Sequence, residues 1–158
     1  MYSPFSMSRP SKSRNKIRVL VVDDYSPFAN LLVGALGNDG YQARAAYSAC
    51  EALRAAEDFK PHAVVLDAIL RDMDGFKLAA EFERRLPACR VLLTSAWDYE
   101  REPAHVRWPY RVVHKAALMD ELSQFLDSCG PSEEVGADYG GGQGLAGCEK
   151  KVCTSPAY

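Results

Sequence analysis

Five short apolar runs alternate with stretches of helical periodicity along the middle of this chain. The runs lie at residues 17–22, 41–46, 63–66, 89–93 and 110–113. The first and third are nearly unbroken and rich in β-branched residues, which is typical of strands buried on both faces of a parallel sheet. Because parallel strands require right-handed helical crossovers, this alternation predicts an α/β domain with a doubly wound parallel sheet.

Helix-bounding residues separate the runs. Ser26 followed by Pro27 predicts an N-cap and a first helical residue, and Ser48 predicts a second N-cap. Pro61 and Pro87 end the second and third helices. The expected helices cover about residues 27–36, 49–59, 76–86 and 118–129.

The segment 96–109, between the fourth and fifth runs, contains Pro103 and Pro109. Any helix there is expected to be short or broken, because a proline inside a helix costs about 3 kcal/mol.

The two ends of the chain differ in composition from the middle. Residues 1–15 form a basic leader, and residues 130–158 hold seven of the eleven glycines, so both are expected to be disordered. This leaves one domain over residues 16–129.

No stretch approaches the roughly 20 apolar residues of a membrane span, and the start of the chain lacks a secretory signal. A cytoplasmic protein is expected, with no membrane partner. The net charge of -2 predicts no direct nucleic-acid partner.

Polar side chains follow four of the five runs. Asp23 and Asp24 end the first, Asp67 the third, Ser95 the fourth and Lys115 the fifth. In doubly wound sheets ligands bind beyond the carboxyl ends of the strands, so these residues are expected to converge. Carboxylates about 4 Å apart repel each other by about 1 kcal/mol even in water. A divalent cation such as Mg²⁺ relieves this repulsion, and Mg²⁺ is the expected cofactor.

A carboxylate beside a metal can act as the nucleophile that accepts a phosphoryl group. The transferring group carries charge on three oxygens, which the protein must neutralise. One of these oxygens can bind the metal, a second can pair with the Lys115 ammonium, and the third can accept a hydrogen bond from the Ser95 hydroxyl.

The ordered motifs resemble those of the receiver domain of two-component response regulators. They read Val-Val-Asp23-Asp24, Val-Val-Leu-Asp67 followed by Met73-Asp74-Gly75, Leu-Leu-Thr-Ser95-Ala96, and Val-Val-His-Lys115. The resemblance covers residues 16–129. It implies a flavodoxin-like (βα)5 fold with strand order 2-1-3-4-5, as in a chemotaxis-type single-domain receiver.

The resemblance also implies a function for the acidic residues. Asp67 accepts a phosphoryl group from a sensor histidine kinase or a phosphotransfer protein. Asp24, Asp67 and the backbone carbonyl of Ile69 hold Mg²⁺, with Asp23 assisting through a water.

Two further residues receive roles from the same comparison. Ser95 is the switch hydroxyl, and Lys115 pairs with the phosphate and acts with Asp67 as the catalytic residues. A stand-alone receiver of this kind signals through a downstream protein target or through self-association, and it is not an enzyme with a substrate of its own.

Three positions depart from the family pattern. Arg71 stands where a proline is usual, and Val112 stands where a switch aromatic is usual, with Tyr110 nearby. Ala116 replaces a proline that normally follows a cis bond. Because a cis bond before alanine costs about 3 kcal/mol, a trans peptide is expected there.

Other functions remain as alternatives. A receiver with altered loops can act as a pseudo-receiver, a phosphorylation-independent protein-binding module. A phosphatase of the haloacid dehalogenase type needs an acid two residues beyond its nucleophile, where this chain has Ile69. A dinucleotide enzyme needs a Gly-x-Gly-x-x-Gly motif after the first strand, which is absent. The spacing of His62 indicates no metal site, and Asp74 is expected to be a turn residue.

Overall fold

The structure is a computed structural model that describes residues 17–97 and 110–129. The strands and helices follow in the order β1 (Arg18–Val22), α1 (Ser26–Asn38), β2 (Gln42–Ala46), α2 (Ala49–Phe59), β3 (Ala63–Asp67), α3 (Gly75–Arg85), β4 (Arg90–Ser95), β5 (Val112–His114), the 3-10 turn η3 (Lys115–Ala117) and α4 (Leu118–Asp127). The expected leader 1–15, the expected tail 130–158 and all but the first two residues of the proline-containing segment 96–109 lie outside the described residues.

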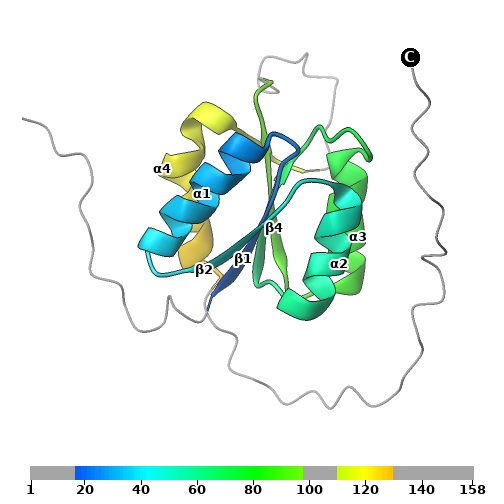
Figure 1. Cartoon of the computed structure of the whole chain (residues 1–158), viewed down its shortest axis with the longest axis horizontal. Helices are drawn as coiled ribbons and strands as arrows, with labels where there is room; N and C mark the ends of the chain where they lie inside the picture. Colours follow the sequence, from blue (N-terminus) through cyan, green and yellow to red (C-terminus); the bar gives the residue numbers. More distant parts are fainter. Residues whose placement is uncertain (1–16, 98–109, 130–158) are drawn as a thin grey trace, which may run out of the picture.

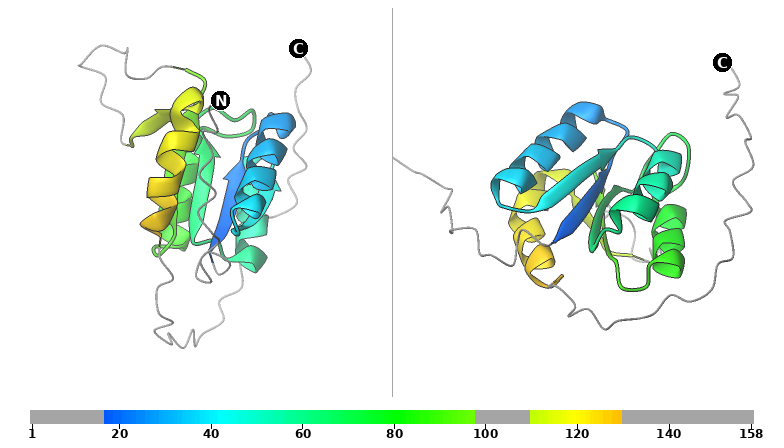
Figure 2. Two further views of the ribbon diagram at one scale, coloured as in Figure 1. Left: turned by 90° about the vertical axis from the view of Figure 1, so that its left-hand side faces the viewer. Right: turned by 60° about the horizontal axis from the view of Figure 1, so that its bottom comes forward.

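The strands form one parallel sheet in the order β2-β1-β3-β4-β5. Helices α1 and α4 cover one face, and α2 and α3 cover the other (Figure 1). The right-hand view of Figure 2 shows the same separation into three layers. The doubly wound α/β fold predicted from the alternation of strands and helices is therefore confirmed, and so is the strand order 2-1-3-4-5 that the family resemblance implied.

The sheet is buried on both faces because its central strands carry apolar side chains in both directions. Along β1, Val19 and Val21 belong to the cluster under α1 and α4, while Leu20 and Val22 belong to the cluster under α2 and α3. All five residues of β3 are buried. Each fully buried valine or leucine contributes about 1.5–3 kcal/mol, so these two strands anchor the domain.

The helix starts agree with the sequence prediction at Ser48 and differ at Ser26. Ser48 accepts a hydrogen bond from the Glu51 amide at 3.1 Å and caps α2. The N-cap of α1 is Tyr25, so the prediction of Ser26 as the cap was wrong by one residue. The Tyr25 carbonyl already accepts from the amide of Ala29, which places Ser26 inside the first turn.

The end of the sheet also differs from prediction by a small shift. Strand β5 covers Val112–His114 rather than 110–113, and it pairs with residues 93–95 of β4. His114 Nδ1 then accepts from the Ala116 amide at 3.2 Å and begins the turn η3. No cis peptide bond occurs in the described residues, so the expected trans peptide before Ala116 is confirmed.

His62 has a structural role that its sequence position did not indicate. The Arg18 amide donates to His62 Nδ1 at 3.0 Å, and the His62 amide donates to the Arg18 carbonyl at 2.9 Å. The Arg90 amide donates to the His62 carbonyl. This residue therefore ties the amino ends of β1 and β4 together.

Protonation of His62 is expected to destabilise the fold. Burial and then the neighbouring Arg18 charge lower the pKa of His62 from its ordinary value of 6.5. The unfolded chain then takes up the proton at a higher pH than the folded chain. The contribution of His62 to the free energy of unfolding is therefore fully present above pH 6.5 and declines as the pH falls below that value. Thermal melting from pH 7 to 5 should show this decline. The variant His62→Asn keeps a side-chain acceptor but cannot titrate there, so an unchanged slope would contradict the assignment.

Candidate functional site

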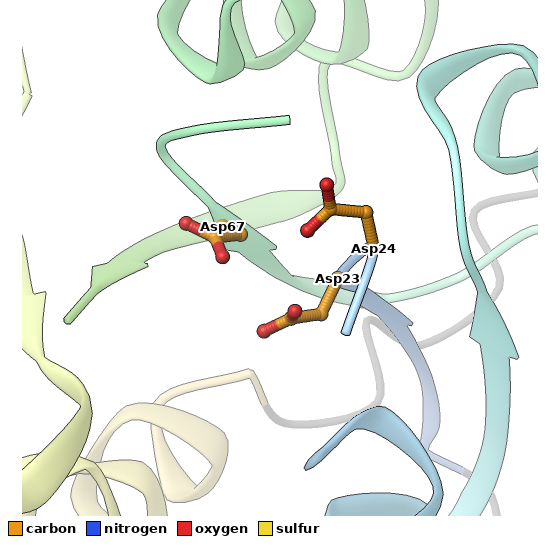
Figure 3. Close-up of side chains that lie close together, drawn as sticks. All are labelled: Asp23, Asp24 and Asp67. Atoms are coloured by element: carbon orange, nitrogen blue, oxygen red, sulfur yellow. The ribbon is translucent and has the colours of Figure 1, made fainter. Parts of the chain in front are cut away.

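Three carboxylates meet at the carboxyl ends of β1 and β3. Strands β1 and β3 are parallel neighbours with Val22 opposite Leu66, so Asp23 and Asp67 follow side by side. One oxygen from each of Asp23, Asp24 and Asp67 lies within 4.8 Å of the others (Figure 3). Asp23 is 1% exposed and Asp67 is 7% exposed. The predicted convergence of these acids is confirmed.

Lys115 joins this cluster from η3, directly after β5. Its Nζ atom lies 2.6 Å from both Asp23 Oδ2 and Asp67 Oδ2. The same Nζ lies 4.8 Å from the ring centroid of Phe28, a cation–π contact from the first turn of α1. Nothing in the spacing of Phe28 along the sequence indicates this contact with Lys115, so it emerges only from the structure.

The electrostatics of the site follow from burial and from these ion pairs. Burial raises the pKa of Asp67, although the hydrogen bonds from Lys115 and the Ile69 amide oppose the shift. Burial alone would lower the pKa of Lys115, but its hydrogen bonds and charge interactions with Asp23 and Asp67 outweigh burial and raise it. The pocket therefore contains three carboxyl groups and a single ammonium group, that of Lys115, among the described residues.

The donor atoms of the pocket fit a divalent cation that prefers oxygen. Asp23 Oδ1 accepts from the Tyr25 amide at 2.9 Å. Asp23 Oδ2 is buried and forms an ion pair with Lys115, and a carboxylate oxygen with one such partner keeps a further acceptor position. Mg²⁺ binds through one or two carboxylates together with water and phosphate oxygens, and these residues provide such a set.

The loop between β3 and α3 approaches the site closely because residue 75 is glycine. A Cβ atom on Gly75 would lie 2.3 Å from the Asp67 carbonyl oxygen and 2.6 Å from Ala68 Cα. The Gly75 amide donates to the Ala68 carbonyl at 3.0 Å. Asp74 caps α3 by accepting from the Phe76 amide, which confirms its expected role as a turn residue.

Ile69 lies in the same loop and contacts the site through its backbone. Its amide donates to Asp67 Oδ1 at 3.0 Å and holds that carboxylate in place. Its side chain is exposed.

Ser95 lies at the same edge of the sheet. Thr94 pairs with Asp67 across β3 and β4, and Ser95 is the next residue and the last of β4. The Ser95 side chain is buried, and its Oγ accepts from the Trp97 amide at 3.0 Å. The Trp97 side chain is exposed.

Arg71 and Asp72 form contacts that sequence analysis missed. Arg71 Nε lies 3.0 Å from Asp24 Oδ2. The Asp72 carboxylate accepts from the amides of Ala49 and Cys50 at the start of α2. The sequence marked Arg71 only as a departure from the family pattern, and no signal within the sequence pairs it with Asp24.

Known proteins with similar sequences include response regulators and their receiver domains, in agreement with the acidic pocket described above. Residues 19–108 match the response regulator receiver domain family. The chain is 34% identical over 83 residues to the alkaline phosphatase synthesis transcriptional regulatory protein PhoP of Bacillus subtilis. It is 35% identical over 82 residues to the probable transcriptional regulatory protein TcrX of Mycobacterium tuberculosis. Each match covers 52% of this chain and 35% of the relative, so the chain spans about a third of their length.

Solved structures share the fold over most of the chain. The response regulator TrrA of Thermotoga maritima, in complex with Mg²⁺-BeF, superposes with a TM-score of 0.61 at 26% identity, covering 72% of this chain and 98% of TrrA. TrrA in complex with the histidine kinase ThkA matches with the same TM-score and identity over 72% of this chain and 97% of TrrA. The receiver domain of Methylobacillus flagellatus, at 24% identity and a TM-score of 0.59 over 72% of this chain and 98% of that domain, supports the fold alone.

No helix within residues 17–97 and 110–129 is long and apolar enough to cross a membrane. The matched family, the sheet order and the acidic pocket agree with one another. The chain belongs to the response regulator receiver domain family, the phosphoacceptor signalling modules of two-component systems, and is not a conventional enzyme.

Proposed function

We propose that this receiver accepts a phosphoryl group on Asp67, from a sensor histidine kinase or a phosphotransfer protein, in a Mg²⁺-dependent reaction. The observation that carries the proposal is the position of Lys115 Nζ, 2.6 Å from Asp67 Oδ2 in a pocket with two further carboxylates. The complexes of TrrA with Mg²⁺-BeF and with a histidine kinase support it by similarity.

In this proposal Asp67 is the nucleophile. A carboxylate oxygen of Asp67 forms a bond to phosphorus as the bond from phosphorus to the donor histidine nitrogen breaks. The Ile69 amide fixes the orientation of the carboxylate through Oδ1. Lys115, which already contacts Asp67 Oδ2, pairs with an oxygen of the transferred group.

Asp23, Asp24, Asp67 and the backbone carbonyl of Ile69 are the proposed holders of Mg²⁺. When bound, the ion neutralises negative charge on the carboxylates and on the phosphoryl oxygens. These residues share the edge of the sheet, and the three carboxylates are already gathered there.

Ser95 is the proposed switch residue. Its Oγ accepts from the Trp97 amide, so its own proton can be donated to a phosphoryl oxygen. A change in that hydrogen bond would alter the chain around the exposed Trp97. The proposed output is therefore a protein contact, made with a downstream target or with a second copy.

The proposed function is tested by phosphorylation with acetyl phosphate and Mg²⁺. Intact mass is expected to rise by one phosphoryl group with Mg²⁺ and to stay unchanged with EDTA. Beryllium fluoride with Mg²⁺ is expected to change the tryptophan fluorescence.

The ion pair of Arg71 with Asp24 favours the second candidate, a phosphorylation-independent binding module. No gain in mass at millimolar Mg²⁺ would support that candidate instead of the proposed function.

A further inference from the structure

We propose that Arg71 is an internal counter-cation for Asp24 and that it competes with Mg²⁺ for this carboxylate. It thereby sets the metal concentration at which the receiver becomes competent for phosphorylation. This inference rests on the proposed function, and it adds a determinant of metal affinity from a residue that is not among the proposed holders of Mg²⁺.

Two basic side chains, Lys115 and Arg71, pair with different carboxylates of the acidic pocket. Lys115 forms ion pairs with the two buried acids, Asp23 and Asp67. Arg71 forms an ion pair with Asp24, whose side chain is 21% exposed. Arg71 thus occupies the outer side of the cluster, on the carboxylate most open to a metal arriving from solvent.

The loop that carries Arg71 is held at the residue that follows. Asp72 Oδ1 accepts from the Ala49 amide at 3.1 Å, and Asp72 Oδ2 accepts from the Cys50 amide at 3.2 Å. Amides at the start of a helix bind a carboxylate well because their dipoles point toward it. Asp72 is therefore a positioning residue, since it ties the backbone beside Arg71 to the start of α2.

The ion pair lines an open surface depression of about 670 Å³, which shares Asp24 with the acidic pocket. Asp24, Arg71 and Asp72 line it together with Tyr47 and Ser48. A metal ion in this depression would therefore lie against the Arg71–Asp24 ion pair.

The energetics favour a pair that a metal can displace. The Arg71 side chain is 85% exposed, and exposed ion pairs are weak and screened by salt. Mg²⁺ brings two charges to the same oxygen, so it wins at sufficient concentration. Loss of this competition should tighten apparent Mg²⁺ binding by about two- to five-fold, the factor expected for one exposed pair.

The test is a MgCl₂ titration of the full chain, followed by tryptophan fluorescence and by the rise in melting temperature. Arg71→Ala is expected to lower the apparent dissociation constant by about two- to five-fold at low salt, and by less in 0.5 M KCl. Lys60→Gln is the matched control, because it removes an exposed lysine from the far end of α2 and should leave the titration unchanged.

Asp72 provides a second, independent variant. Asp72→Ala should tighten Mg²⁺ binding in the same direction but by less, and it should add nothing when Arg71 is already alanine. A structural effect of the lost helix contact alone would appear in both backgrounds.

The outcomes separate this inference from the proposed function. Equal Mg²⁺ affinity in Arg71→Ala and the unmodified protein, or weaker affinity in the variant, overturns the role of Arg71. If both proteins are still phosphorylated at saturating Mg²⁺ in that case, the proposed function stands. If neither protein responds to Mg²⁺ by fluorescence or melting, and neither is phosphorylated, both proposals fail.

Discussion

Replacing Asp67 with asparagine is expected to abolish phosphoryl incorporation completely. The amide oxygen of asparagine carries no negative charge, so it is a poor nucleophile toward phosphorus. The fold should persist, because the new side chain has the same shape and can accept the hydrogen bond that the Ile69 amide now donates to Asp67 Oδ1. Lys115 retains its ion pair with Asp23.

The measurement is intact mass after incubation with acetyl phosphate and Mg²⁺, and again with a phosphorylated histidine kinase. Asp39→Asn is the matched control, because Asp39 is the residue that follows α1, outside the acidic cluster. The control should gain one phosphoryl group, and Asp67→Asn should gain none. Equal incorporation in both variants would place the phosphoacceptor at another residue.

Replacing Gly75 with alanine is expected to destabilise the domain by about 1–3 kcal/mol, the range for an added methyl group that has no space. The added Cβ would lie 2.3 Å from the Asp67 carbonyl oxygen. This neighbour is backbone at the end of a buried strand, so it cannot rotate away as a side chain could. Relief of the clash must move α3 or the loop, and either change displaces the Ile69 amide from Asp67.

Urea denaturation measures the change in the free energy of unfolding. Gly34→Ala is the control, since a Cβ on Gly34 meets nothing within 4 Å and the residue lies within α1. That variant should be more stable by up to about 1 kcal/mol, because alanine favours helix over glycine. A Gly75→Ala protein as stable as the unmodified one would mean that α3 does not approach the loop this closely.

The fold could be predicted from the sequence because its main determinants are local. The runs that form β1 and β3 are apolar on both faces, which indicates buried parallel strands. Once those strands are neighbours, the positions of Asp23 and Asp67 directly after Val22 and Leu66 place the acids together. The convergence of the site is thus a consequence of strand length and register.

The contacts around this core could not be predicted, because they depend on the exact ends of elements and on loops. The sequence predicted Ser26 as the N-cap of α1, whereas the structure has Tyr25 in that position. Either residue can adopt the cap conformation, so the course of the chain after β1 determines which of the two is the cap. Phe28 meets Lys115 across more than eighty residues of sequence. The Arg71 pair with Asp24 likewise joins a loop to a strand end.

The most direct test of the account is a crystal structure of this protein with Mg²⁺ and beryllium fluoride. We expect beryllium fluoride on the Asp67 carboxylate, Mg²⁺ bound by Asp24 and Asp67, and Lys115 in contact with a fluorine atom. Arg71 should have left Asp24. Beryllium fluoride absent from Asp67, or a metal bound away from Asp24 and Asp67, would contradict the proposed phosphoacceptor site.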